Sequence, residues 1–246
     1  MARKRSTPEA PPDARPAPTG DQQATEERAA LGAALTAEYG VLAGALSTAW
    51  SASLTRTSLF LFSLSASGVA LGFAAQAGVA SPTFRAFGLA LLPVLLFLGV
   101  ATFVRLVELQ RESVIYITGM NRIRHYFVET VPASRPYFVL PIHDDAFALY
   151  RSMGTGMRRH PPRYVFPNLV AQTQGIVGVV AAAVAAALVG LAAAPAGDVA
   201  AWASAALAFA ATVIGLFTYW QRSFSELQRS IEPISPTPPD EIGAPF

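Results

Sequence analysis

Four stretches of this chain contain no Asp, Glu, Lys or Arg, and each is long enough to cross a membrane as a helix. They are residues 58–79, 86–104, 174–194 and 199–220. A helix needs about 20 predominantly apolar residues to cross a hydrocarbon layer about 30 Å thick. A buried core helix can be as apolar, but four such helices are uncommon in a chain of 246 residues. The sequence therefore predicts an all-α integral membrane protein with four transmembrane helices in two hairpins and a small helical cytoplasmic element.

Composition narrows the classes of function. Hydrophobic residues make up 52% of the chain and charged residues 14%, against about 25% charged in an ordinary soluble domain. The chain has no Cys, which excludes disulfides, a thiolate nucleophile and iron–sulfur ligands. No charged side chain lies within the four apolar stretches, whereas ion-coupled transporters, proton pumps and voltage sensors keep charged residues there. Transport of those kinds is therefore disfavoured.

The basic residues are distributed unevenly about the predicted spans. The two short connections hold only Arg85, whereas the other 17 Lys and Arg residues precede the first span, follow the fourth, or lie between the second and third. Lys and Arg accumulate in cytoplasmic loops beside spans. The first 57 residues are too long and too polar to be a cleavable signal peptide. We therefore expect a multi-pass protein of the bacterial inner membrane, with both termini and the central segment in the cytoplasm.

The segments outside the spans differ in composition. The first 24 residues are rich in Pro and charge, as is the end of the chain from Glu232, and such segments cannot bury enough apolar area to order themselves. The predicted organisation is a disordered tail (1–24), a cytoplasmic helix leading into the membrane (25–57), the first transmembrane hairpin (58–107), a cytoplasmic segment (108–172), the second transmembrane hairpin (173–220) and a cytoplasmic tail that is disordered at its end (221–246).

Apolar residues beyond the second span recur at the spacing of one helix face. They are Leu109, Tyr116, Met120, Ile123 and Phe127. This spacing predicts that the helix of the second span continues into the cytoplasm and ends at Val131-Pro132. An apolar face in water needs a partner, so we expect it to pack on the helix that precedes the first span.

His143, Asp144 and Asp145 resemble a metal or acid/base site, but their surroundings favour another interpretation. A metal-dependent hydrolase needs further ligands nearby, and the other histidines, His125 and His160, lie 18 and 17 residues away, which matches no compact ligand motif. Following a proline, Asp144 is placed to cap a helix at about 145–153, with Asp145 in its first turn. We therefore expect no catalytic residue, cofactor or metal, and a protein that is not an enzyme. A hydrolase using the histidines is the weakest alternative.

Small residues recur at four-residue steps in the third span, where they form a seam of Gly178, Ala182, Ala186 and Gly190. Such a seam lets another helix approach closely. The sequence does not decide whether that helix is the fourth span or belongs to another subunit, so a homo-oligomer stays an open alternative.

A polar stripe follows one face of the first span and includes Ser58, Ser65, Gly72 and Gln76. In a ring of subunits it would line a narrow pore. The alternative, which we favour, is a close helix contact with hydrogen bonds across it.

Arginines gather at two places in the cytoplasmic segment. They are Arg122, Arg124, Arg158, Arg159 and Arg163. Beside membrane spans such residues typically set the topology and contact anionic headgroups, so we expect contact with lipid or with a cytoplasmic partner and no nucleic acid.

The sequence therefore favours a non-enzymatic multi-pass membrane scaffold or sensor. Its partners would be the lipid bilayer and an unknown cytoplasmic protein bound by the cytoplasmic element. The alternative is a small oligomeric channel or membrane-perturbing effector gated through the cytoplasmic segment.

Overall fold

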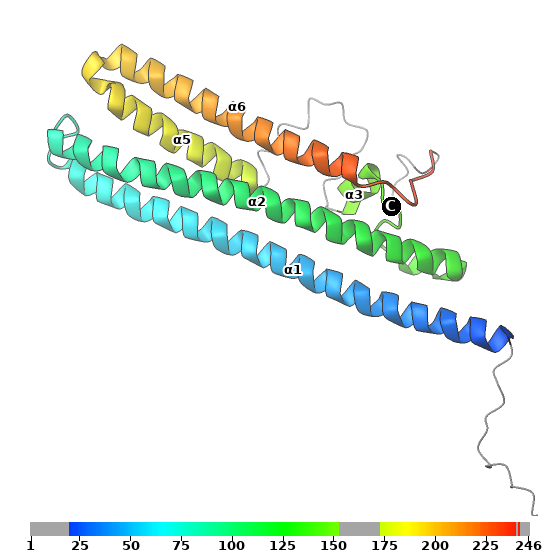
Figure 1. Ribbon diagram of the computed structural model, residues 1–246. Helices are drawn as coiled ribbons and strands as arrows, with labels where there is room; N and C mark the ends of the chain where they lie inside the picture. The colour runs from blue at the N-terminus through cyan, green and yellow to red at the C-terminus, as the bar shows by residue number, and fades with distance from the viewer. Residues whose placement is uncertain (1–19, 153–172, 240, 242–246) are drawn as a thin grey trace, which may run out of the picture. The chain divides into compact units, whose positions relative to one another are not determined.

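The computed structural model describes residues 20–152, 173–239 and 241, and all regular secondary structure in these residues is helical (Figure 1). The elements are α1 (Gly20–Ala75), α2 (Pro82–Thr130), η1 (Pro132–Tyr137), α3 (Ala146–Ser152), α5 (Thr173–Ala193), η3 (Ala194–Ala196) and α6 (Asp198–Ser230). Four helices, α1, α2, α5 with η3, and α6, are long and apolar enough to cross a membrane. The prediction of an all-α chain with four such helices is thereby confirmed.

The chain divides into two compact units, residues 1–38 and residues 39–246. In the first unit, residues 20–38 form the beginning of α1 and are exposed almost throughout. The helix already begins at Gly20, inside the segment predicted to be disordered up to residue 24. The second unit holds the rest of α1 and all the other elements.

The core of the second unit lies where α1, α2 and α5 meet. One buried cluster consists of Phe60, Phe103, Leu106, Val107 and Val177. A Cβ atom at Gly99 would lie 3.0 Å from the Cβ of Ala181 and 3.1 Å from the ring of Phe60. Gly99 is therefore what lets α1 and α5 approach the same turn of α2, since any larger side chain there would displace a buried neighbour.

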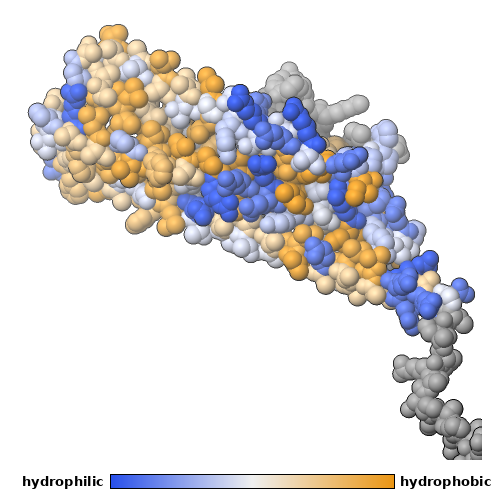
Figure 2. Space-filling model, viewed as in Figure 1, coloured by the Kyte–Doolittle hydropathy of each residue, from blue (hydrophilic) through white to orange (hydrophobic). Residues whose placement is uncertain are grey.

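Polar bonds tie the helices together at both ends of the apolar stretches. The side-chain oxygen of Gln110 on α2 accepts from Nε2 of Gln174 on α5 at 2.7 Å and from the indole N–H of Trp220 on α6 at 3.3 Å. At the opposite end Arg85 donates to the carbonyl of Ala192 at 3.5 Å, near the C-terminus of α5, where carbonyls lack helical partners. Figure 2 shows mostly hydrophobic residues over the left part of the molecule, where Figure 1 has the turns of the two hairpins, and many more hydrophilic residues, mixed with hydrophobic patches, further to the right.

The helix α2 continues without a break to Thr130 and is capped at Val131, as the sequence predicted. We use the name polar end for the part of the second unit that contains the beginning of its α1 portion (from Tyr39), α2 after Gln110, η1, α3 and the residues that follow Trp220. There Leu42 of α1 contacts α2 at Gly119, where an added Cβ would lie 2.9 Å from the leucine Cδ1. The expected packing of the α2 extension on the helix that precedes the first span is therefore present.

Candidate functional site

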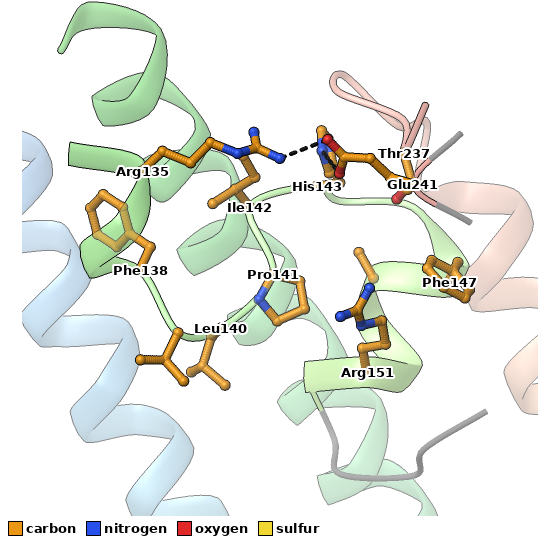
Figure 3. A pocket seen from close by; sticks show the side chains of 12 residues that line it. Arg135, Phe138, Leu140, Pro141, Ile142, His143, Phe147, Arg151, Thr237 and Glu241 are labelled. Carbon is orange, nitrogen blue, oxygen red and sulfur yellow. Dashed lines mark hydrogen bonds and ion pairs between the residues drawn. The ribbon is translucent and has the colours of Figure 1, made fainter. Parts of the chain in front are cut away.

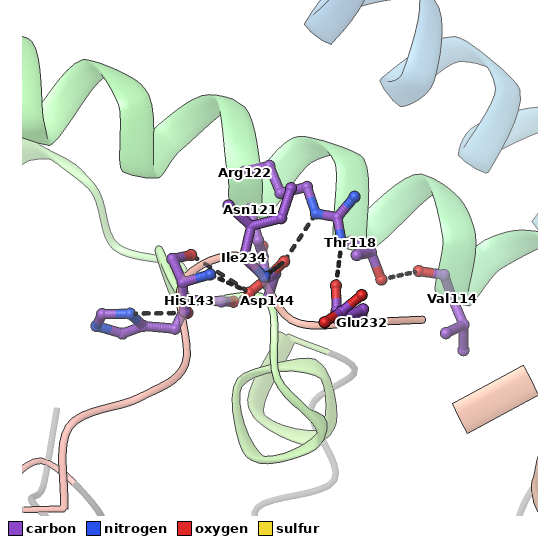
Figure 4. Close-up of polar contacts among 9 residues, drawn as sticks. Val114, Thr118, Asn121, Arg122, His143, Asp144, Glu232 and Ile234 are labelled. Carbon is purple, nitrogen blue, oxygen red and sulfur yellow. Dashed lines mark hydrogen bonds and ion pairs between the residues drawn. The ribbon is translucent and has the colours of Figure 1, made fainter. Parts of the chain in front are cut away.

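Asp144 lies at the centre of the polar end and is 1% exposed. Its carboxylate accepts the backbone N–H groups of Ile234 and Ser235, both at 2.9 Å, and Nε of Arg122 at 2.7 Å (Figure 4). The prediction that Asp144 caps the following helix is therefore wrong. Asp144 instead joins α2 to the segment that follows α6.

Asp145 is the residue that caps α3. The backbone N–H of Ala148 donates to its Oδ1 at 2.8 Å, and the helix begins at Ala146. The same carboxylate accepts the backbone N–H of Thr237 at 2.8 Å and the Thr237 hydroxyl at 3.0 Å. Two adjacent aspartates thus have different roles, and the local sequence does not distinguish them because either suits an N-cap.

The segment held by these carboxylates, residues 231–239 and 241, is here called the strap. Four of its residues are prolines, which lack an N–H and favour extended backbone: Pro233, Pro236, Pro238 and Pro239. The N–H groups of the residues between them, Ile234, Ser235 and Thr237, donate to Asp144 and Asp145. The residues from Glu232 on were expected to lack order because they bury little apolar area. In the described part of this segment, hydrogen bonds to the buried Asp144 and to the partly buried Asp145 hold the backbone in place.

The ionisation of Asp144 follows from its surroundings. Burial by itself raises the pKa of this carboxyl, but the hydrogen bonds from Ile234, Arg122 and Ser235 outweigh burial and hold the pKa below its ordinary value. Asp144 is therefore a carboxylate at neutral pH, and its charge is compensated by donors on two different segments.

The two arginines of α2 that were expected to contact lipid or a partner are used inside the chain. Arg122 bridges Asp144 and the backbone carbonyl of Glu232, the latter at 2.8 Å. Arg124 is 3% exposed and donates to Oδ1 of Asn121 at 2.6 Å and to the hydroxyl of Tyr39 at 2.7 Å. The expectation of headgroup or partner contact is thus wrong for Arg124, because its guanidinium is buried. Arg158, Arg159 and Arg163 lie outside the described residues.

Two of the three histidines lie close together at the polar end. The rings of His125 and His143 have centroids 5.6 Å apart. His143 contacts the carbonyl of Ser235 through Nδ1 at 3.3 Å and a carboxylate oxygen of Glu241 through Nε2 at 3.4 Å. Within the part of the chain that the structure describes, no three His, Asp or Glu residues are grouped so as to hold a metal ion. His160 lies outside that part.

A cavity of 350 Å³ opens between η1, the segment leading to α3, α3 itself and the strap (Figure 3). Its charged lining residues come from three elements: Arg135 from η1, Arg151 from α3 and Glu241 from the strap. Arg135 donates to Glu241 at 2.6 Å, and the guanidinium of Arg151 lies 5.6 Å from the centre of the Phe147 ring. The site therefore combines charged groups with an apolar wall.

The remaining predicted residues lie in the apolar helices. A Cβ at Gly178 would meet the ring of Phe103 at 3.1 Å and Leu216 of α6 at 3.7 Å, and one at Gly190 would meet Ala205 of α6 at 3.1 Å. Ala182 is buried and Ala186 partly buried. Within this chain the seam therefore packs against α2 and α6.

The polar stripe, in contrast, is exposed in the part of the chain that the structure describes. Ser58, Ser65, Gly72 and Gln76 are all exposed, and a Cβ at Gly72 would have no heavy atom within 4 Å. None of the helices that the structure describes therefore supplies the favoured helix contact. Contact with another subunit and a pore are both still consistent with an outward stripe.

The sequence did not point to Ser235, Thr237 and Glu241 of the strap, or to Arg135 of η1, as parts of this site. One signal was available: single non-proline residues between prolines present N–H groups on an extended backbone that a nearby carboxylate can bind. Comparison of the chain with family models, with curated proteins and with solved structures gave no match.

Proposed function

We propose that this protein is a non-enzymatic multi-pass scaffold or sensor of the bacterial inner membrane, with both termini and the polar end in the cytoplasm. The strong bias of basic residues to one side supports this orientation. Large apolar side chains exposed on the apolar helices, such as Phe62 (75%), Phe97 (74%) and Leu207 (72%), support insertion in lipid. Trp220, bonded to Gln110, suits the membrane–water boundary at the cytoplasmic side.

The observation that carries the proposal is the use of the His-Asp-Asp motif. Asp144 and Asp145 both bind the strap, so the residues that most resemble a catalytic site join the far end of α2 to the segment after α6. A displacement of α6 along α2 would have to break these bonds. In a sensor, such a displacement of α6 would change the polar end. In a scaffold, the same bonds would keep the polar end fixed as a surface for a partner.

The partner surface we favour lies on the segment that follows α2 in the chain. Tyr137 and Val139 are 83% and 81% exposed there. The segment returns along α2, since the carbonyl of Pro141 accepts from Arg124 at 3.3 Å. Arg124 is 19 residues beyond Arg105 on α2, which is about 29 Å along a helix. Lipid does not cover apolar side chains at that distance, so the surface fits a cytoplasmic protein.

Site-specific photocrosslinking tests this function. A photoreactive residue at Tyr137 should give one discrete adduct in cells, and the substitution Val131→Asp, at a residue that is also exposed, should abolish it. The same residue at Glu226, which is exposed on α6, serves as the matched control and should give none. If positions 137 and 226 give the same adducts, the partner surface is not on this segment.

A second candidate, an oligomeric channel, is favoured by one observation, the outward orientation of the polar stripe. Hydroxyls and the Gln76 amide around a common axis would replace part of an ion's hydration. We expect a scaffold to give no ion flux above background in liposomes. Single-channel currents that Ser65→Leu abolishes, with the mass of the complex in nanodiscs unchanged, would establish the channel in place of the scaffold.

A further inference from the structure

We propose that the cavity between η1, α3 and the strap binds a small anionic molecule with an apolar body, a carboxylate or a phosphate ester. The inference rests on the proposed function as a sensor and names the class of its ligand. The cavity of 350 Å³ lies within the range of small-molecule sites, about 300–1,000 Å³. Its position beyond the end of the apolar stretches makes it accessible to solutes in water.

The charges around the cavity select an anion. Among the described residues, the guanidinium groups of Arg135 and Arg151 line it together with one carboxylate, that of Glu241. Arginine presents several N–H donors in a plane that matches a carboxylate or a phosphate. His143 adds an imidazole at the strap side.

The rest of the lining suits an apolar body. The aromatic and aliphatic residues there are Phe138, Val139, Leu140, Pro141, Ile142 and Phe147. Because the guanidinium of Arg151 lies over Phe147, the aromatic wall and a cation face the same space (Figure 3). A ring or a branched chain attached to the anionic group would contact both.

The chain itself shows how an anion is held. Glu241 of the strap is bound by Arg135 at 2.6 Å, so an incoming anion and Glu241 compete for the same guanidinium. Ligand binding would release the strap at Glu241 while Asp144 still holds it at Ile234 and Ser235. The site is thereby coupled to the segment that joins α2 and α6.

The test uses the full chain in nanodiscs and three water-soluble probes: phenyl phosphate, benzoate, and benzyl alcohol as the uncharged control. Calorimetric titration should show saturable binding of at least one anion and none of the alcohol. Binding of phenyl phosphate alone would identify the ligand class as a phosphate ester. Binding of both anions would show that the cavity accepts either anionic group. Arg135→Gln should weaken binding at least tenfold.

The decisive variant is Glu241→Gln, which removes the competing charge and should tighten binding several-fold. Arg222→Gln, exposed on α6 outside the cavity, should leave affinity unchanged. Hydrogen exchange of Ile234 and Ser235 shows whether the strap stays in place in each variant, and Arg151→Gln replaces Arg135→Gln if it does not. Absence of saturable binding of either anion, or weaker binding by Glu241→Gln, overturns the site. Either result leaves the photocrosslinking test of the partner surface unaffected.

Discussion

The carboxylate of Asp144 accepts the backbone N–H of Ser235, a residue 91 positions further along the chain. The two residues belong to segments that follow different helices, α2 and α6, and the bond lies beyond the apolar part of both. It therefore fixes the far ends of the two helices to each other by hydrogen bonds, with Arg122 as the third participant.

Replacing Asp144 by Ala should release the strap. Two backbone N–H groups and Arg122 lose their acceptor, and we expect the free energy of strap opening to fall by about 3 kcal/mol. Asp144→Asn should also open the strap, because an amide offers one acceptor oxygen and adds a donor where donors already converge. Hydrogen exchange at Ile234 and Ser235 measures the effect, with Glu226→Ala as the control. Unchanged exchange in Asp144→Ala would show that the strap is held by other contacts.

Acid should detach the strap through the same residue. The pKa of Asp144 in the folded protein lies below its ordinary value, so its contribution is fully present above the unfolded pKa of about 3.9 and is lost as the pH falls through the lower folded value. The strap should therefore stay bound from neutral pH down to about pH 4. Because the chain has no Cys, spin labels at Ala146→Cys and Glu232→Cys report the distance directly. Release already at pH 6 would exclude Asp144 as its cause.

The long helices were predictable because their signal is local. Absence of charge over about 20 residues identifies an apolar helix wherever its neighbours lie, and Val131-Pro132 ends α2 because a proline disfavours helix at the residue before it. The site was not predictable in the same way. The roles of Asp144 and Asp145 are set by a strap far along the chain, and Arg124 is buried because Tyr39 of another helix reaches it. The residues next to Asp144, Asp145 and Arg124 in the sequence do not indicate either contact.

Close packing at Gly99 should be sensitive to size, unlike packing at Gly215. Gly99→Leu places a side chain against Phe60 and Ala181 and should destabilise the protein by about 2 kcal/mol or more. Gly215→Leu, where an added Cβ has no heavy atom within 4 Å, should change stability by less than about 0.5 kcal/mol. Unfolding in mixed micelles with increasing dodecyl sulfate compares the two. Equal midpoints would mean that α1 and α5 do not meet at Gly99.

The bond between Tyr39 and Arg124 should contribute measurably to the polar end. Tyr39→Phe removes one acceptor from a buried guanidinium, which should cost about 1–3 kcal/mol. Tyr137→Phe is the matched control, because that tyrosine is 83% exposed and should be neutral. Hydrogen exchange along α2 from Gly119 to Arg124 locates the effect. A neutral Tyr39→Phe would show that this part of α1 does not hold the arginine in solution.

The strap also sets an order of events during biosynthesis. Ser235 is synthesised 91 residues after Asp144. At ordinary rates of translation, about 5–20 seconds pass before the N–H groups that bind the Asp144 carboxylate have been made. During that interval α5 and α6 must be synthesised and placed, while Asp144 and Arg122 stay hydrated and the wall of Phe138 and Phe147 stays open. A nascent chain arrested before Ile234 therefore has a polar end without the bonds between Asp144 and the strap. A protease or chaperone that contacts only the polar end can distinguish this state from the completed one.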